Sequence, residues 1–285
     1  QEEQVDFVGG AAVVAKHLKR AGAQVEFTSI LGEDDLQDYV LHDLRESGID
    51  CHILVDPTRP TTRKTVFISQ NQRMLKVDKL DNRPIVDKYV KQIQETISTS
   101  GADVFVFSDF RHGIFSRQTI SRLVSSIPDG RLKVADSQVA SRWGNILDFQ
   151  GFDLITPNEK EARFSLGDQD SVVRPLALEL YKRAKCRCLM LKMGERGLLT
   201  YRSEEGRAHI NIDTFAQHVV DSVGSGDALL AYATLALATT KSEVIASILG
   251  SVAAAVACES EGNNPVAPKS ILAKLQTIEK QLQYS

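Results

Sequence analysis

The feature that most constrains the fold is a regular alternation between short strand-like runs and longer helical patterns. The run VFVF at 104–107 is apolar at every position, which is typical of a strand that helices cover on both sheet faces. Regular alternation of this kind predicts an α/β fold with a mostly parallel, doubly wound sheet flanked by helices. Strands are predicted at 25–31, 64–69, 73–78, 103–109, 132–137, 153–157, 188–194 and 197–202.

Helical periodicity fills most intervals between these strands. One segment, about 51–80, breaks the rhythm, because it holds two strands of alternating polarity, the turn SQNQ at 69–72 and no helix. This pattern is typical of an antiparallel hairpin, so we expect a single domain over 1–285 with a small antiparallel β-flap. Helices are predicted at 10–21, 34–47, 84–99, 116–126, 158–166, 175–185, 226–239, 241–260 and 268–281.

The composition argues against several classes of protein. Of the 285 residues, 42% are hydrophobic and 25% are charged, and the net charge of −3 provides no basic surface for nucleic acid or anionic lipid. The longest apolar run, 228–238, is shorter than the about 20 residues that a membrane-spanning helix needs. We therefore expect no nucleic-acid partner and no membrane partner.

Cysteine usage indicates a reducing compartment. There are four cysteines, and two of them, Cys186 and Cys188, form a C-x-C pattern in the predicted strand KCRCLMLKMG. A metal site would need further ligands nearby, and the sequence around the pair offers none. We therefore interpret the pair as buried structural cysteines, and the lack of a disulfide framework predicts a cytoplasmic location.

The loop DSVGSGD at 221–227 carries the strongest chemical signal. Gly224 and Gly226 allow backbone angles that other residues avoid, and the helix predicted to follow points its unpaired N–H groups at the same place. Two interpretations remain open. Gly224, Ser225 and Gly226 form an oxyanion cradle with Asp227 as a base, or the loop only caps a helix whose first turn holds an acid.

Other polar residues fall at predicted strand ends, where open parallel sheets bind their ligands. They are Asp109, Asp136, Asn158 with Glu161, and the turn KMGERG at 192–197. Asn158 and Glu161 also have the spacing of a capping box, so helix capping is the alternative to ligand binding. The P-loop pattern and the G-x-G-x-x-G pattern of dinucleotide sites are both absent from the sequence.

Several motifs, in order along the chain, resemble the ribokinase-like (PfkB) carbohydrate kinases. DSVGSGDALLA is similar to that family's D-T-x-G-A-G-D signature, and TPNEKEA at 156–162 is similar to its N-x-x-E motif. LKMGERGLLTY at 191–201 resembles its nucleotide-side turn, and residues 8–34 resemble its N-terminal G-G-A-x-N segment. More narrowly, residues 59–81 and 106–116 resemble bacterial heptose-7-phosphate kinases of ADP-heptose and lipopolysaccharide synthesis.

The resemblance implies a ribokinase-like fold and a kinase that uses ATP and Mg²⁺. It implies that Asp227 is the general base for a sugar hydroxyl and that the amides of Gly224, Ser225 and Gly226 bind the transferring phosphoryl group. Asn158 and Glu161 are expected to hold Mg²⁺ and its waters near the phosphates. The nucleotide-side residues that it implies are Asn158, Lys192, Gly194, Gly197 and, near the adenine, Asn263.

The resemblance also implies residues for the acceptor. Gly9 and Gly10 are expected to approach the sugar through bare backbone, and Asp109 to accept a hydrogen bond from a sugar hydroxyl. Arg63 and Lys64, on the flap, are expected to meet a substrate phosphate. The structural alternatives are a helix-entry turn for the glycines and solvated charges for the two cations.

Two departures from the family pattern lie on the acceptor side. Val13 stands where G-G-A-x-N has its asparagine, and Gln138 stands where heptose kinases have the lysine of D-x-K. Two alternatives to a heptose-7-phosphate 1-kinase therefore remain. One is a kinase of the same family for another sugar or a nucleoside, and the other is a catalytically weak binding or regulatory module.

For partners, the resemblance implies a sugar or sugar-phosphate substrate and a homodimer through the β-lid. We expect this lid to be formed mainly by about 51–80, with an N-terminal strand at 3–8. Two-stranded flaps are marginally stable alone in water, and pairing with a second copy would bury their apolar side. The resemblance also implies a link to a nucleotidyltransferase.

Overall fold

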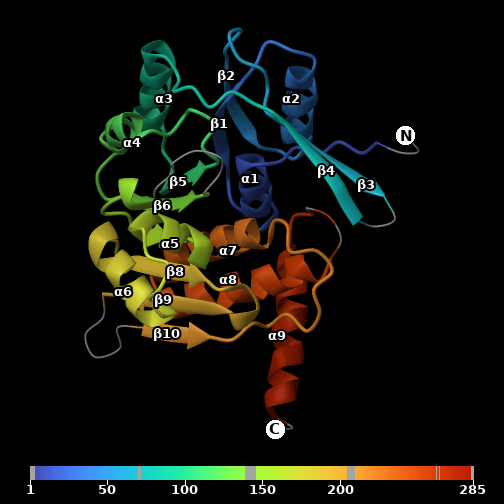
Figure 1. The fold of residues 1–285 in the computed structure, drawn as a ribbon, viewed down its shortest axis with the longest axis vertical. Helices are drawn as coiled ribbons and strands as arrows, with labels where there is room; N and C mark the ends of the chain where they lie inside the picture. The colour runs from blue at the N-terminus through green and yellow to red at the C-terminus, as the bar shows by residue number, and fades with distance from the viewer. Residues whose placement is uncertain are drawn as a thin grey trace. The chain divides into compact units, whose positions relative to one another are not determined.

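The structure is a computed structural model that describes residues 4–69, 72–138, 146–203, 209–260, 262 and 264–283 (Figure 1). Its chain divides into two compact units, and the single domain that we expected stays a prediction. We call the first the sheet unit, which comprises Gln1–Val25, Gly101–Phe110 and Pro128–Ser285. We call the second the hairpin unit, which comprises Glu26–Ser100 and Arg111–Ile127.

The sheet unit is built on a six-stranded sheet in the order β10-β9-β8-β7-β6-β5. The first four strands along the chain pair in parallel, and the last two pair antiparallel with their neighbours. They are β5 (Val104–Asp109), β6 (Leu132–Ser137), β7 (Leu154–Ile155), β8 (Cys188–Lys192), β9 (Leu198–Arg202) and β10 (His209–Ile212). The predicted mostly parallel sheet is therefore confirmed.

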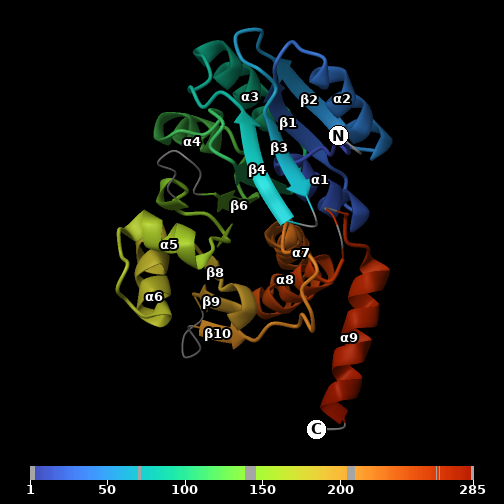
Figure 2. The same cartoon turned by 45° about the vertical axis from the view of Figure 1, so that its right-hand side comes forward.

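Helices cover both faces of this sheet, with α5 and α6 on one face and α7 and α8 on the other (Figure 2). Leu189, Met190 and Leu191 of β8 alternate between the faces and are all fully buried, which confirms the double cover. Gly250 lets α8 approach α7 closely, because a Cβ added there would lie 3.2 Å from the Leu229 carbonyl oxygen. The helices are α1 (Ala11–Arg20), α5 (Glu159–Leu166), α6 (Val173–Ala184), α7 (Ser225–Thr240), α8 (Glu243–Cys258) and α9 (Pro268–Gln283).

The hairpin unit holds two small sheets. β1 and β2 pair in parallel, and β3 and β4 form the predicted antiparallel hairpin, with a register shift between Phe67 and Ile68. A capping box between Ser116 and Thr119 begins α4. The elements are β1 (Glu26–Leu31), α2 (Leu36–Glu46), β2 (Asp50–Val55), β3 (Arg63–Ser69), β4 (Gln72–Lys79), α3 (Asp87–Thr99) and α4 (Arg117–Val124).

Three expectations about strands differ from the structure. β2 lies in the segment that we assigned to the flap, but it is the parallel partner of β1, with α2 as the connection between them. Strand β1 belongs to this separate pair and not to the six-stranded sheet. Residues 4–8, the described part of the lid strand expected at 3–8, form no strand, and Val5 and Phe7 there are largely exposed.

The C-x-C pair has the buried position that the sequence predicted for it. All four are free thiols, and Cys186 and Cys188 are buried. Burial raises the pKa of the Cys186 thiol to about 12, so this group stays protonated and unreactive at neutral pH.

Among the described residues, no helix combines the length and the apolar character that crossing a membrane requires.

Candidate active site

The sheet unit gathers several predicted site residues at the carboxyl ends of its parallel strands. Asp109 ends β5, Asp136 lies next to the last residue of β6, and Lys192 ends β8. Asn158 follows β7 and pairs with Lys192 in a parallel bridge. Parallel strands end at the same sheet edge, which is where ligands of open α/β sheets bind.

The amide cradle was expected at the start of α7, and its role there stays a prediction. Gly224 is the N-cap residue, with a left-handed φ of 81° and no side-chain cap. The first helical bond runs from the Ala228 amide to the Gly224 carbonyl oxygen over 3.0 Å, so the amides of Gly226 and Asp227 lie before the helical ladder begins. The structure thus shows a helix N-terminus of the kind that attracts anions, as both interpretations of the loop require.

Asp227 lies in the first turn of α7 and has a strongly perturbed carboxyl group. Burial raises its pKa to about 7, the Asp136 carboxylate adds to the rise, and the Lys192 ammonium offsets part of it. Glu161 also raises this pKa. A carboxylate that changes its charge near neutral pH can accept a proton there, which is the property that a general base needs.

A buried ion pair lies beside the cradle. The Lys192 ammonium donates a hydrogen bond of 3.0 Å to Asp136 Oδ1, and the Thr156 hydroxyl donates one of 2.9 Å to the same oxygen. Burial alone would lower the pKa of Lys192, but the surrounding carboxylates, Asp136 first, outweigh it and raise that pKa. The sequence placed Asp136 at a strand end without a role and missed Thr156, although both precede loops at the sheet edge.

Asn158 and Glu161 form the capping box that was the alternative to ligand binding. The Asn158 side-chain oxygen accepts the Glu161 amide at 2.8 Å, and Glu161 Oε2 accepts the Asn158 amide at 2.7 Å. The described residues contain no cluster of three His, Cys, Asp or Glu side chains that would hold a metal alone. An all-oxygen pair of this kind fits Mg²⁺ that keeps its waters and is held mainly by phosphates.

The two glycines in the turn after β8, Gly194 and Gly197, differ in how much space a side chain would have. Gly197 has a left-handed φ of 82°, and a Cβ there would collide with the Ile212 carbonyl oxygen, so packing requires this glycine. Gly194 has a φ of 61° but has open space where its Cβ would lie. The nucleotide-side role of both glycines and of Lys192 stays a prediction, and Asn263 lies outside the described residues.

On the acceptor side, Gly9 and Gly10 lie at the start of α1, which fits the helix-entry turn that was the alternative to sugar binding. Gly10 is the N-cap of α1 with a φ of 63°, and Gly9 precedes it. Asp109 is 1% exposed and accepts a hydrogen bond of 3.1 Å from the Ser137 hydroxyl. Val13 is buried in α1, so a polar side chain at this position would face the interior of the protein.

In the hairpin unit, Lys64 and His112 lie in one charged environment. Burial and the neighbouring Lys76 lower the pKa of Lys64, which pairs across the hairpin with Asp78. Burial and the Lys64 charge lower the pKa of His112 to about 4, so its imidazole is neutral at pH 7. His112 is half-buried, with Nδ1 3.1 Å from the Asn82 side-chain oxygen. The phosphate contact assigned to Arg63 and Lys64 stays a prediction.

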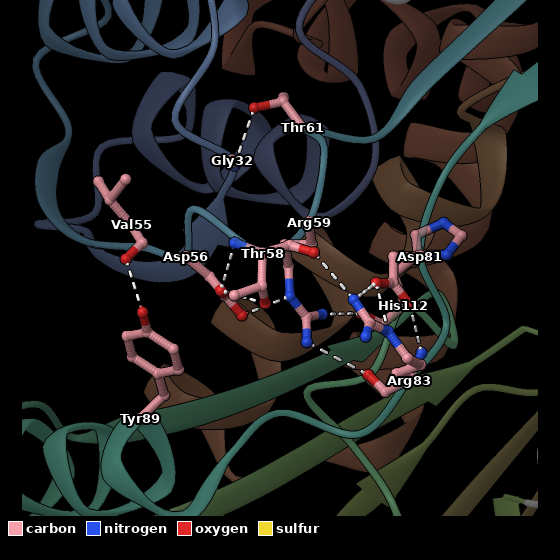
Figure 3. Close-up of polar contacts among 10 residues, drawn as sticks. All are labelled: Gly32, Val55, Asp56, Thr58, Arg59, Thr61, Asp81, Arg83, Tyr89 and His112. Carbon is pink, nitrogen blue, oxygen red and sulfur yellow. Dashed lines mark hydrogen bonds and ion pairs between the residues drawn. The ribbon is translucent and has the colours of Figure 1, made fainter.

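A buried arginine that the sequence did not single out holds the base of this hairpin (Figure 3). Arg59 Nε donates to Asp56 Oδ2 at 2.8 Å, and the same guanidinium donates to the carbonyl oxygens of His112 and Arg83 at 3.4 Å each. Arg83 donates in return to the Thr58 carbonyl oxygen at 2.8 Å. The segments before β3 and after β4 are therefore tied to each other and to the loop before α4.

Curated relatives that match this chain include proteins named "Bifunctional protein HldE" from several bacteria. The one from Geobacter metallireducens is 29% identical over 275 residues, which are 94% of this chain and 55% of that protein. The one from Rhodopseudomonas palustris is 29% identical over 284 residues, which are 96% of this chain and 56% of that protein. The chain thus spans about half the length of the curated relatives that it matches.

Solved structures share the fold at low sequence identity. Phosphofructokinase-2 from Escherichia coli, in complex with potassium, has a TM-score of 0.78 and 17% identity, with 95% of this chain and 87% of that chain covered. Ribokinase from Thermotoga maritima has a TM-score of 0.72 and 21% identity, with 93% and 86% covered. These similarities confirm the predicted ribokinase-like fold. The family model "pfkB family carbohydrate kinase" matches residues 1–270, and the chain therefore belongs to the pfkB family of carbohydrate kinases.

Proposed function

We propose that this chain transfers the terminal phosphoryl group of ATP to a hydroxyl group of a sugar or sugar phosphate, in the presence of Mg²⁺. The observation that carries the proposal is Asp227, a carboxyl group with a pKa of about 7 in the first turn of α7. Such a group is matched to taking a proton from a hydroxyl at neutral pH. It stands directly beside amides and a helix dipole that favour an anion.

In the proposed reaction, the acceptor oxygen forms a bond to the γ-phosphorus while the bond from that phosphorus to the ADP oxygen breaks. The acceptor proton passes to the Asp227 carboxylate, and ADP leaves with the electron pair of the broken bond. The amides around Gly224, Ser225 and Gly226 hold the transferring group. Mg²⁺, when bound, neutralises phosphate charge, and Asn158 and Glu161 are the residues that would hold it through its waters.

For the acceptor, we propose a heptose 7-phosphate that is phosphorylated at its 1-hydroxyl. The support is the similarity of residues 59–81 and 106–116 to heptose-7-phosphate kinases, together with the relatives named HldE. A different acceptor is the second candidate. It is supported by Val13, which is buried and apolar, and by Gln138, which has no charge to offer a substrate phosphate.

The proposal is tested by ADP release over a panel of heptose phosphates, hexose phosphates, free sugars and nucleosides. We expect turnover with at least one sugar, and a loss of about 10²–10⁴-fold in kcat for Asp227→Asn. Asp213→Asn, an exposed aspartate before α7, is the matched control and keeps full activity. Tight MgATP binding without turnover of any acceptor would instead support a binding or regulatory module.

We also propose a link between this kinase and a nucleotidyltransferase. The support is that the curated relatives are named bifunctional and that the chain covers only 55% of the first of them. A nucleotidyltransferase that makes a nucleotide sugar needs a phosphate on the anomeric carbon. Phosphorus NMR of the product checks this, because transfer of the new phosphate to any carbon other than the anomeric one would remove the chemical reason for the link.

Finally, we propose a homodimer through one face of the hairpin. Phe67, Leu75 and Val77 lie on the same face and are 49%, 56% and 48% exposed, which is unusual for apolar side chains that lie together. The opposite face carries Lys64 and Asp78, whose charges act on His112. A two-stranded hairpin whose apolar face is exposed to water is only marginally stable. A second copy of the chain would cover this apolar face.

A further inference from the structure

Lys192 is placed at the cradle by its backbone as well as by its ion pair. Its backbone amide donates a hydrogen bond to the Pro157 carbonyl oxygen at 2.9 Å, and Lys192 forms a parallel β-bridge with Asn158. These two contacts hold the backbone of Lys192 at the end of β8. A lysine side chain has four rotatable bonds and ends in a compact charge with three donors.

The ammonium group lies directly against the cradle. A Cβ added to Gly226 would be 3.3 Å from Lys192 Nζ, 3.7 Å from its Cδ and 3.9 Å from its Cε. The side chain thus runs along the bare backbone of Gly226, next to the amides that precede the helical ladder of α7. Any larger residue at 226 would press on this lysine.

The negative charges of three carboxyl groups act on the Lys192 ammonium. Asp136 holds the ammonium, and Glu161 and Asp227 also act on it, so one cation stands among three carboxyl groups. Asp136 and Lys192 have side chains that are only 6% and 16% exposed. A polyphosphate that entered next to Gly226 would meet negative charge from all three, and the Lys192 ammonium lies close enough to Gly226 to offset part of that charge.

We propose that Asp136 is a positioning residue. With Thr156, it holds the Lys192 ammonium against Gly226, so that Lys192 keeps its hydrogen bond to Asp136 and binds the terminal phosphate of the nucleotide with a remaining donor. This inference rests on the proposed function, since it assumes a nucleotide at the cradle. It assigns roles to Asp136 and Thr156, which act through Lys192 and do not touch the reacting atoms.

Replacing Lys192 and replacing Asp136 are expected to have different effects on nucleotide binding. Lys192→Met removes the cation, so it weakens binding of the terminal phosphate and slows transfer. Asp136→Asn keeps an oxygen for Thr156 and Lys192 but removes the competing charge, so the nucleotide binds at least as tightly while the ammonium loses its fixed position. Removal of one oriented charge near a developing charge typically costs about 10²–10³-fold in kcat.

The first test measures binding without turnover, by calorimetry with a non-hydrolysable ATP analogue and with AMP, each in the presence and absence of Mg²⁺. We expect Lys192→Met to weaken binding of the analogue about tenfold and to leave AMP unchanged. We expect Asp136→Asn to bind the analogue as tightly as the wild type or more tightly. Equal weakening by Asp136→Asn and Lys192→Met would overturn the proposal, because Asp136 would then hold the nucleotide or its metal directly.

The second test measures kcat for the single variants and the double variant. We expect a loss of about 100-fold for Lys192→Met, about tenfold for Asp136→Asn and less for Thr156→Val. The double variant is expected to be no slower than Lys192→Met alone, because Asp136 acts through the lysine. Losses that multiply in the double variant would show an independent role for Asp136 and would contradict the inference.

Controls separate this inference from folding and from the proposed function. Arg187→Met breaks the pair with Glu243 at the other end of β8 and is expected to leave analogue binding unchanged. Thermal melting checks each variant, and Thr156→Val replaces Asp136→Asn if the latter does not fold. If the wild type turns over no acceptor, the proposed function fails, but the analogue-to-AMP comparison in Lys192→Met still tests the phosphate contact.

Discussion

At the scale of single residues, the ionisation of Asp227 links the geometry of the site to pH. Its pKa of about 7 means that the free protein gains its base as the pH rises through neutrality. We expect kcat/KM to increase with a midpoint near pH 7, and Lys192→Met to move this midpoint upward, because the ammonium lowers the pKa of Asp227. The profile is measured with an unphosphorylated acceptor, so that no acceptor phosphate titrates in the same range. A flat profile between pH 5 and pH 8 would contradict this role.

The same carboxyl group predicts a pH dependence of stability. In the unfolded chain its pKa is about 3.9, and in the folded chain it is about 7, so the native state binds the proton more tightly. This contribution is complete below about pH 4 and is lost as the pH rises to about 7. We expect Asp227→Asn to raise Tm relative to the wild type by more at pH 8 than at pH 4. For Asp213→Asn, at an exposed position, the difference in Tm from the wild type is expected to be the same at pH 4 and at pH 8.

Two glycines of the turn after β8 form a matched pair for mutation. Both have a positive φ, but a Cβ at Gly197 would meet the backbone of β10, whereas one at Gly194 meets nothing within 4 Å. We expect Gly194→Ala to cost only the strain of a left-handed residue, about 1–2 kcal/mol. Gly197→Ala adds a backbone collision and is expected to cost at least about 1–3 kcal/mol more. Urea unfolding measures both, and equal costs would show that packing does not select Gly197.

Residue-level prediction from sequence found the start of α7, because that signal is local. Gly224, Gly226 and Asp227 lie within a few positions of each other, so the glycines predicted the turn that begins the helix, while the catalytic roles of the cradle and of Asp227 stay predictions. The interaction of Asp136, Thr156 and Lys192 was not predictable, because the three residues come from different parts of the chain and meet only through the lateral order of β6, β7 and β8. The same limit hid Arg59, whose partners include a carbonyl oxygen 53 positions away.

At the scale of elements, Arg59 is expected to determine how firmly the hairpin is held at its base. Its side chain and that of Asp56 are 7% and 4% exposed, and breaking such a buried pair typically costs about 3–5 kcal/mol. We expect Arg59→Met to lower the free energy of unfolding by about this amount, and Asp56→Asn with Arg59→Met to lower it by less than the sum of the single changes. Arg122→Met, which breaks a more exposed pair with Asp87, is the control and is expected to cost much less.

The elements themselves were mostly predictable, and the exceptions have physical reasons. The sequence predicted α1, α2, α3 and the later helices because their apolar positions repeat at helical spacing. It missed β2, which carries DCHILV, because we read residues 51–80 as one flap and gave this strand no partner. It missed β10, because His209–Ile212 is only four residues long and lies at the sheet edge, where two of its four side chains are exposed. Which strands share a sheet depends on tertiary pairing, which a single sequence does not display.

At the scale of the whole molecule, the proposed dimer makes the two faces of the hairpin unequal. Phe67 lies on the apolar face with Leu75, whereas Val66 lies on the opposite face beside Lys76. Both side chains are exposed, at 49% and 40%, so replacing either one by lysine costs little within a single chain. An interface through the apolar face, however, would bury only the lysine at position 67, and an unpaired buried charge opposes association.

We therefore expect Phe67→Lys to convert a dimer into a monomer, and Val66→Lys to remain dimeric. Sedimentation velocity at micromolar concentration measures both variants beside the wild type, and thermal melting confirms that each is folded. If the hairpin also serves the acceptor, the monomeric variant raises the KM for the sugar and leaves the KM for ATP unchanged. A wild-type chain that sediments as a monomer, or dissociation by Val66→Lys but not by Phe67→Lys, would rule out pairing through this face.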